Sequence, residues 1–174
     1  DYAQLLTDVR FSTMATYMYE DAVKLPVALF VVELLTTVAR HEHENRQLFE
    51  FVDASIDVLQ LDGEHTANFH LVFMTMLTRL VGIAPDEETY AAGSWLDLRE
   101  GCFTLLRPAH QDVAQPEVAR RIALFLRGGF EGVAMPMNRD ERNCCLDALM
   151  DYYRLHLPSF PELKSVAILR QLFQ

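Results

Sequence analysis

Residues 27–40 constrain the fold most, because they are almost entirely apolar and Glu33 is their only charge before Arg40. Pro26 precedes them, and proline suits the first position of a helix, where its missing N–H costs nothing. A helix that is apolar on every side has to be covered on every side. The segment therefore predicts a buried helix at the centre of a helical bundle.

Apolar residues at helical spacing predict further helices along the chain. These helices are expected over residues 45–61, from Thr66 or Asn68 to residue 81, over 116–128, from Asn138 to the break at Pro158, and from about residue 163. Asn138 and Glu141 have the spacing of a capping box, in which each side chain accepts a hydrogen bond from the other residue's backbone N–H. The helices account for most of the chain.

Residues 83–115 differ in character from the helical segments around them. Two short apolar runs, 95–98 and 102–105, flank a turn that contains Gly101. This pattern is typical of a β-hairpin, which is marginal alone and has to pack against the helices. We therefore expect a mainly α protein, a helical bundle with a small inserted β-hairpin subdomain over about residues 83–115.

The charge balance argues against nucleic-acid binding by this chain alone. Its formal net charge is −10, whereas a surface that follows a phosphate backbone needs clustered cations. No apolar run is long enough to cross a bilayer, so no membrane partner is expected. The three cysteines include the adjacent pair Cys144 and Cys145, which is a poor disulfide framework and indicates a reducing, cytoplasmic compartment.

No group of residues in the sequence predicts catalysis, so we do not expect an enzyme. The sequence has no GxSxG, Walker or GxGxxG motif and no pattern typical of a Ser–His–Asp triad. His41 and His43 stand two residues apart, so their side chains would diverge on a helix, and a solvated helix end is expected there. Asp86, Glu87 and Glu88 are expected to form a solvated loop.

Several segments in order resemble one known family. They are ALFVVELL at 28–35, NRQLF at 45–49, ANFHLVF at 67–73, LVGIAP at 80–85, and YYRLHL at 152–157 followed by LKS at 163–165. In this order and spacing they resemble the helical C-terminal domain of the bacterial recombination mediator RecO, in its Bacteroidetes-type form. The similarity runs from about residue 24 to the end of the chain.

The resemblance implies a role in DNA repair by homologous recombination. RecO proteins carry an N-terminal OB-fold that binds DNA, so residues 1–24 are expected to be a linker or the tail of that fold, and 25–174 the helical domain. The helical domain is expected to dock RecR and the acidic, Phe-terminated tail of single-stranded-DNA-binding protein, helping to load RecA onto coated single strands. An unrelated helical regulatory or oligomerisation domain is the alternative.

The sequence departs from the family at one point, the metal site. Many RecO domains hold zinc with two CxxC pairs after the third helix, but residues 83–115 offer only Cys102 and His110 as nitrogen or sulfur ligands. We therefore expect no metal and no other cofactor, and the hairpin has to be held by its own packing.

A binding site for an acidic tail ending in Phe needs an apolar pocket beside a cation that can pair with a carboxylate. The helix before residue 81 offers Phe69 and Phe73 on one face, His70 between them, and Arg79 further along. These four residues are the predicted partner-binding site. The alternative is that the two Phe rings are core and that Arg79 is a solvent-facing charge at the helix end.

Overall fold

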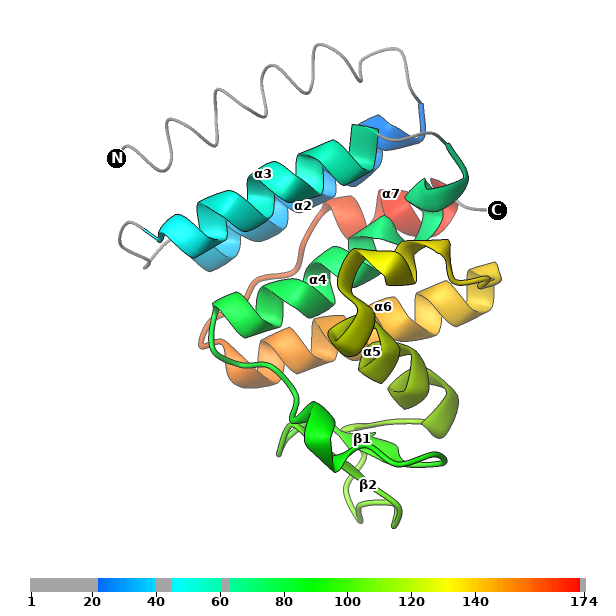
Figure 1. Cartoon of the computed structure of the whole chain (residues 1–174). Coiled ribbons are helices and arrows are strands. Elements are labelled where there is room, and N and C mark those ends of the chain that lie inside the picture. The colour runs from blue at the N-terminus through cyan, green and yellow to red at the C-terminus, as the bar shows by residue number, and fades with distance from the viewer. Residues whose placement is uncertain (1–21, 40–44, 61–62, 173–174) are drawn as a thin grey trace. The chain divides into compact units, whose positions relative to one another are not determined.

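The computed structural model describes residues 22–39, 45–60 and 63–172 (Figure 1). The chain divides into two compact units, one made of Asp1–His70 with Glu162–Gln174 and the other of Leu71–Pro161. The boundary falls within helix α4 (Phe69–Leu80). Both units are built mainly from helices, and the second contains a small antiparallel sheet. The expected fold class, mainly α with a small β insert, is confirmed.

The first unit contains α2 (Lys24–Val38), α3 (Arg46–Gln60), the 3-10 helix η2 (Gly63–Asn68) and α7 (Ser165–Leu172). α2 packs against α7. Helix α2 begins two residues before Pro26, which therefore lies inside its first turn. Phe30 and Leu34 are fully buried, but Leu29 is 52% exposed. The composition of α2 predicts a helix that is covered on every side, and the structure leaves one side of it partly open.

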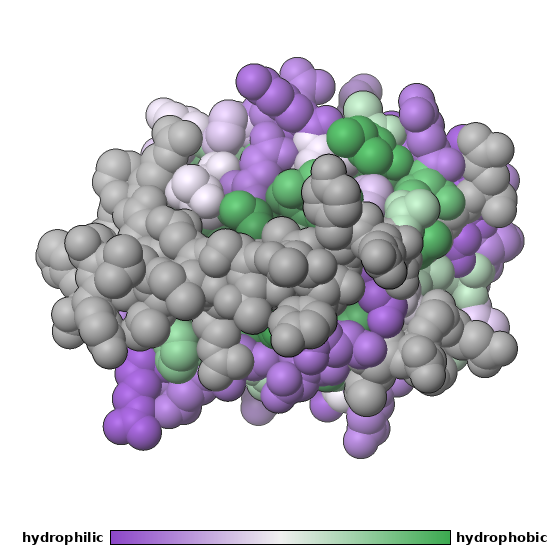
Figure 2. All heavy atoms as spheres, turned by 90° about the horizontal axis from the view of Figure 1, so that it is seen from above, coloured by the Kyte–Doolittle hydropathy of each residue, from purple (hydrophilic) through white to green (hydrophobic). Residues whose placement is uncertain are grey.

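Hydrophobic residues reach the surface beside hydrophilic ones in Figure 2. In the first unit the exposed large hydrophobic side chains include Val23, Leu29 and Ile168. Among the described residues, no helix has both the length and the apolar character needed to cross a membrane. Residues 1–21, which make up most of the expected linker, lie outside the described part of the chain, as do His41 to Glu44.

The second unit contains the rest of α4 together with α5 (Pro116–Gly128), the 3-10 helix η4 (Gly129–Ala134) and α6 (Arg139–His156). The capping box at the start of α6 is confirmed, since Glu141 N–H donates to Asn138 Oδ1 at 2.9 Å and Asn138 N–H donates to Glu141 Oε2 at 2.8 Å. Tyr153 is fully buried on α6, and its hydroxyl donates to the Met74 carbonyl of α4 at 2.8 Å. A polar bond in the core thus joins α4 to α6.

The insert between α4 and α5 holds η3 (Glu87–Thr89) and strands β1 (Trp95–Asp97), β2 (Cys102–Thr104) and β3 (Val113–Ala114). The strands are antiparallel in the order β2-β1-β3, and buried Leu96 lies between Phe103 and Ala114. The predicted β1–β2 hairpin is present. The third strand was not predicted, because two residues are too few to show an alternating pattern.

Candidate partner-binding site

The four residues predicted to form a partner site all lie on α4, but they differ in exposure. Phe69, His70 and Phe73 are 1%, 2% and 0% exposed, so in this structure they belong to the core. The His70 ring packs edge-on against Phe30, with ring centroids 6.2 Å apart. The Arg79 side chain is 40% exposed. Of the four side chains, only that of Arg79 reaches the surface. A role in partner binding stays a prediction for all four residues.

Arg79 lies in the last turn of α4, where it joins two separate segments. Its Nη2 donates to Glu87 Oε2 at 2.6 Å and to the Leu126 carbonyl at 2.8 Å. Leu126 belongs to the last turn of α5, where carbonyl groups have no partner within the helix and carry partial negative charge. The Arg79 guanidinium therefore caps the end of α5 and pairs with a carboxylate at the same time.

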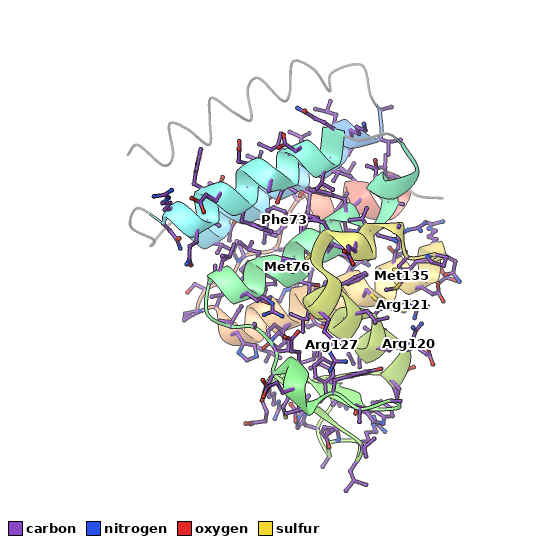
Figure 3. The ribbon with its side chains drawn as sticks, viewed as in Figure 1. Phe73, Met76, Arg120, Arg121, Arg127 and Met135 are labelled. Carbon is purple, nitrogen blue, oxygen red and sulfur yellow. The ribbon has the colours of Figure 1, made fainter. Side chains whose placement is uncertain are left out.

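A second arginine holds the same segment. Arg127 Nη2 donates to the backbone carbonyl of Glu87 at 3.0 Å, and its Cζ lies 5.3 Å from the centre of the Tyr90 ring, in cation–π range. Figure 3 labels Arg127 on α5 and Met76 on α4. We call Arg79 and Arg127 the arginine cluster, since both donate to Glu87.

The segment held by the arginine cluster is acidic, and we call Asp86, Glu87 and Glu88 the acidic turn. Asp86 N–H donates to the Gly101 carbonyl at 2.7 Å, and the Asp86 side chain caps η3 by accepting from Glu88 N–H. Asp86 and Glu88 are exposed, whereas the Glu87 side chain is only 30% exposed. Asp86 and Glu88 are thus solvated as expected, whereas Glu87 is partly covered where Arg79 binds it.

An aromatic residue follows the acidic turn and fixes it to the sheet. The Tyr90 ring meets the Phe103 ring edge-on, with centroids 5.3 Å apart, and Thr89 Oγ1 accepts a bond from Phe103 N–H at 2.8 Å. The segment therefore reads as carboxylates followed by an aromatic ring, lying against two guanidinium groups. Sequence reasoning missed this arrangement, because Glu87 is 8 residues from Arg79 and 40 from Arg127.

An apolar group lies one turn before Arg79. Met76 is partly exposed on α4, and its side chain approaches Gly129 at the end of α5. A Cβ added at Gly129 would lie 3.6 Å from the Met76 methyl group, and the positive φ of 54° there favours glycine. The Met76 side chain therefore lies within ordinary van der Waals range of the end of α5.

The residues of the β insert do not fit a zinc site. In the described part of the chain, no group of three or more His, Cys, Asp or Glu side chains is placed to hold a metal ion. His110 instead pairs with Asp97, with 3.1 Å between Nε2 and Oδ2. Cys102 lies on β2, and its pKa is raised by burial and by neighbouring carboxylates, which disfavours the thiolate that binds metal.

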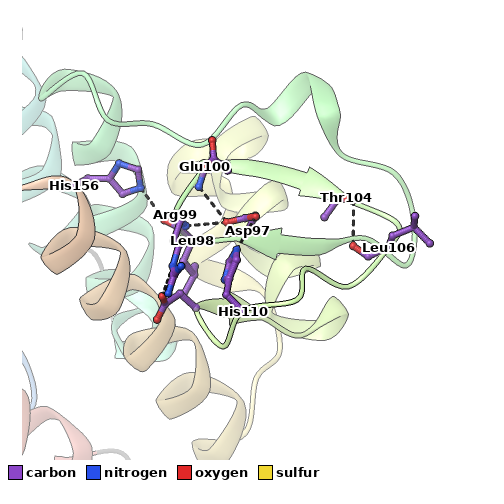
Figure 4. A network of polar contacts seen from close by, with 9 residues as sticks. Asp97, Leu98, Arg99, Glu100, Thr104, Leu106, His110 and His156 are labelled. Atoms are coloured by element: carbon purple, nitrogen blue, oxygen red, sulfur yellow. Dashed lines mark hydrogen bonds and ion pairs between the residues drawn. The ribbon is translucent and has the colours of Figure 1, made fainter.

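Asp97 supplies the contacts that hold the insert instead (Figure 4). Its Oδ1 accepts from the backbone N–H groups of Arg99 and Glu100 at 2.9 and 3.0 Å, which fixes the turn between β1 and β2. Burial acts to raise the pKa of this carboxyl, but the hydrogen bonds from Glu100, His110 and Arg99 outweigh it, and the pKa is lowered. His156 of α6 donates to the Leu98 carbonyl at 2.8 Å and so ties the turn to a helix.

The adjacent cysteines lie on α6 and are not placed alike. Cys144 is exposed, whereas Cys145 is fully buried, and burial raises the Cys145 thiol pKa to about 12. A thiol with so high a pKa stays protonated at neutral pH and is a poor nucleophile. Cys145 therefore behaves as a packing residue.

Comparison with known proteins gives a consistent result. Residues 19–166 match the family model described as recombination protein O C terminal. Proteins named DNA repair protein RecO are similar: that of Phocaeicola vulgatus is 42% identical over 154 residues, covering 88% of this chain and 64% of the relative. Those of Bacteroides fragilis and Porphyromonas gingivalis are 41% and 36% identical, covering 94% and 97% of this chain.

The chain spans about two thirds of the length of these relatives, with 64%, 68% and 70% of their residues covered. No solved structure matches it significantly. The family match covers far more than half of the chain and includes every helix of the second unit. The resemblance seen in the sequence is therefore confirmed, and the chain belongs to the recombination protein O family, matching the C-terminal domain of that family.

Proposed function

We propose that this chain is the partner-docking domain of a recombination mediator that acts in DNA repair by homologous recombination. Its relatives are named DNA repair proteins, and the family model bears the name of recombination protein O. In this proposal the domain helps to load RecA onto single-stranded DNA coated by single-stranded-DNA-binding protein. Family membership removes the alternative of an unrelated helical regulatory or oligomerisation domain.

The arginine cluster is the observation that carries the docking proposal. In a chain of net charge −10, Arg79 and Arg127 lie together and already hold a carboxylate, a carbonyl and an aromatic ring. An acidic peptide that ends in Phe presents the same kinds of group, and guanidinium groups bind carboxylates through strong charge-assisted hydrogen bonds. We infer that the tail of single-stranded-DNA-binding protein docks at this cluster.

The proposal includes two further partners, RecR and DNA. RecR is the second protein partner of the proposal, and DNA is bound mainly by the OB-fold that the family carries before this domain. The domain itself works by binding and positioning, without catalysing a reaction and without a cofactor, in the cytoplasm.

Calorimetric titration with the tail peptide tests the proposal. Arg79→Ala is expected to weaken binding by about 1.5 kcal/mol, the lower end of the range for a hydrogen bond to a charged group, because the side chain is 40% exposed. Arg139→Ala is the control, since it removes an exposed arginine from the start of α6 and so changes the net charge equally.

The two variants separate specific docking from general attraction of charges. Equal weakening by both would show that the peptide responds only to net charge, and the arginine cluster would lose its assignment. Circular dichroism of both variants checks that each remains folded.

A further inference from the structure

We propose that the acidic turn is an internal occupant of the arginine cluster, so that Glu87 competes with an acidic partner for Arg79. The inference rests on the docking function proposed above and concerns the regulation of that same site. The observation behind it is that Arg79, although its side chain is 40% exposed, already has an anionic ligand. Its Nη2 already binds Glu87 Oε2 at 2.6 Å and the Leu126 carbonyl at 2.8 Å.

The two bonds of Arg79 differ in what an incoming peptide can replace. The Leu126 carbonyl belongs to the backbone of α5 and is part of the fold, whereas the Glu87 carboxylate is a side chain on a short surface segment. A carboxylate from a partner can take the place of Glu87 without disturbing the bond to Leu126. Arg79 would then stay oriented by α5 while it changes its anionic ligand.

The acidic turn also resembles the incoming ligand in its chemistry. Asp86, Glu87 and Glu88 are followed within two residues by the Tyr90 ring, over which the Arg127 guanidinium lies at 5.3 Å. An acidic peptide with a terminal aromatic residue offers the same two features. The turn therefore occupies the cluster with groups of the kind that the partner brings.

The internal contact is weak enough to be displaced. The Arg79 and Glu87 side chains are 40% and 30% exposed, and ion pairs in such settings contribute little because water screens them. Displacing Glu87 still has a cost, because the backbone of the acidic turn is held in place. Asp86 N–H donates to the Gly101 carbonyl, and Thr89 Oγ1 accepts from Phe103 N–H on β2. Glu87 thus lowers the apparent affinity for an acidic partner by a few fold.

Replacing Glu87 by its amide tests this competition. A short synthetic peptide, acidic and ending in a Phe with a free carboxylate, is titrated into the chain by calorimetry. Glu87→Gln is expected to bind this peptide about two- to fivefold more tightly than the wild type, the range that matches an exposed ion pair. The same peptide with an amidated C-terminus should show a smaller increase in affinity from Glu87→Gln if the terminal carboxylate is the group that replaces Glu87.

Glu88→Gln is the matched control. Glu88 carries the same charge one residue away, and in the described part of the chain its carboxylate forms no hydrogen bond or ion pair, so its removal lowers the negative charge without releasing Arg79. An equal gain for Glu87→Gln and Glu88→Gln would overturn the proposal in favour of simple charge repulsion. A gain confined to Glu87→Gln supports it.

The Arg79→Ala background completes the test. If Glu87 acts by occupying Arg79, Glu87→Gln should not increase the affinity for the peptide in a chain that already carries Arg79→Ala. An undiminished increase in affinity in that double variant would overturn the proposal. Tight binding by the wild type with no gain in Glu87→Gln would reject the competition but leave the docking function standing. Absence of binding by all variants would reject both.

Discussion

Glu33 is the acidic residue of α2, a helix made mostly of apolar residues, and its surroundings explain why it is there. Its Oε1 accepts a hydrogen bond from Lys164 N–H at 2.9 Å, and its Oε2 accepts from Ser165 N–H at 2.9 Å and from the Ser165 hydroxyl. Ser165 begins α7, so the Glu33 carboxylate satisfies N–H groups that have no partner within that helix. A carboxylate is also favoured at the positive end of the helix dipole.

The protonation of Glu33 should therefore affect the stability of the first unit. Burial acts to raise the pKa of Glu33, but the hydrogen bonds from Ser165 and Lys164 outweigh it, and the pKa is lowered. A carboxyl whose pKa is lower in the folded than in the unfolded chain stabilises the fold above its unfolded pKa of about 4.3. This contribution is lost as the pH falls through the folded pKa.

We expect Glu33→Gln to lower the free energy of unfolding by about 1 kcal/mol at neutral pH, the typical effect of losing a helix cap. The difference between wild type and variant should shrink as the pH falls below about 4, because the wild-type carboxyl is then protonated as well. Urea unfolding at a series of pH values measures this. A difference that does not change with pH would mean that the charge of Glu33 is not what stabilises α7.

Arg79 shows the limit of what could be predicted for single residues. Its charge, surrounded by apolar residues on α4, marks it in the sequence, and the structure places it at the surface with a carboxylate bound. Phe69 and Phe73 are equally prominent in the sequence but are buried. Helical spacing predicts that the two rings share a face, but the same spacing is produced by a groove and by a core.

At the scale of elements, local patterns predicted most of the helices, because periodicity, caps and stop residues lie within a few positions of one another. The capping box of Asn138 and Glu141 is an example, as is Pro116 at the start of α5. What the sequence did not predict depends on distant contacts. Glu33 meets Ser165 across 132 residues, and β3 pairs with β1 although it is only two residues long.

The β insert is held by the hydrogen bonds that Asp97 accepts and by the bond from His156 to the Leu98 carbonyl. Since no metal cluster is placed among the described residues, we expect a chelator to leave the thermal unfolding temperature of the chain unchanged. Asp97→Ala should instead lower the free energy of unfolding by about 1–3 kcal/mol, because the N–H groups of Arg99 and Glu100 lose their acceptor.

Asp112→Ala is the control for Asp97→Ala. It removes the same charge from the insert, but Asp112 forms a surface ion pair with Arg99 whose contribution should be below about 1 kcal/mol. Urea unfolding compares the two variants with the wild type. A thermal melt with and without chelator, together with elemental analysis of the protein, tests the expectation about zinc. A lower unfolding temperature after chelation, with one zinc per chain, would contradict this account.

At the scale of the whole molecule, the cations are few and many are already paired. Among the described residues, arginines within 4 Å of a carboxylate are found in both units, on helices α3 to α6 and in the β insert. The pairs are Arg46–Glu50, Arg79–Glu87, Arg99–Asp112, Arg120–Glu117, Arg121–Glu141 and Arg154–Asp151. A guanidinium that pairs with a carboxylate is less available to a phosphate, so this arrangement adds to the effect of the net charge.

We therefore expect this chain to bind single-stranded DNA weakly, with a dissociation constant above about 1 µM at physiological salt, because nonspecific affinity comes from the counterions that cations release from the phosphates. Its affinity should also depend little on salt concentration, since few phosphates would be neutralised. Filter binding over a range of salt concentrations measures both quantities. Arg79→Ala should leave this weak affinity nearly unchanged while it weakens the binding of the acidic peptide, because one arginine that serves a carboxylate is a small part of a diffuse phosphate interaction. Sub-micromolar binding with a steep salt dependence that Arg79→Ala reduces would instead show that the arginine cluster is a nucleic-acid site.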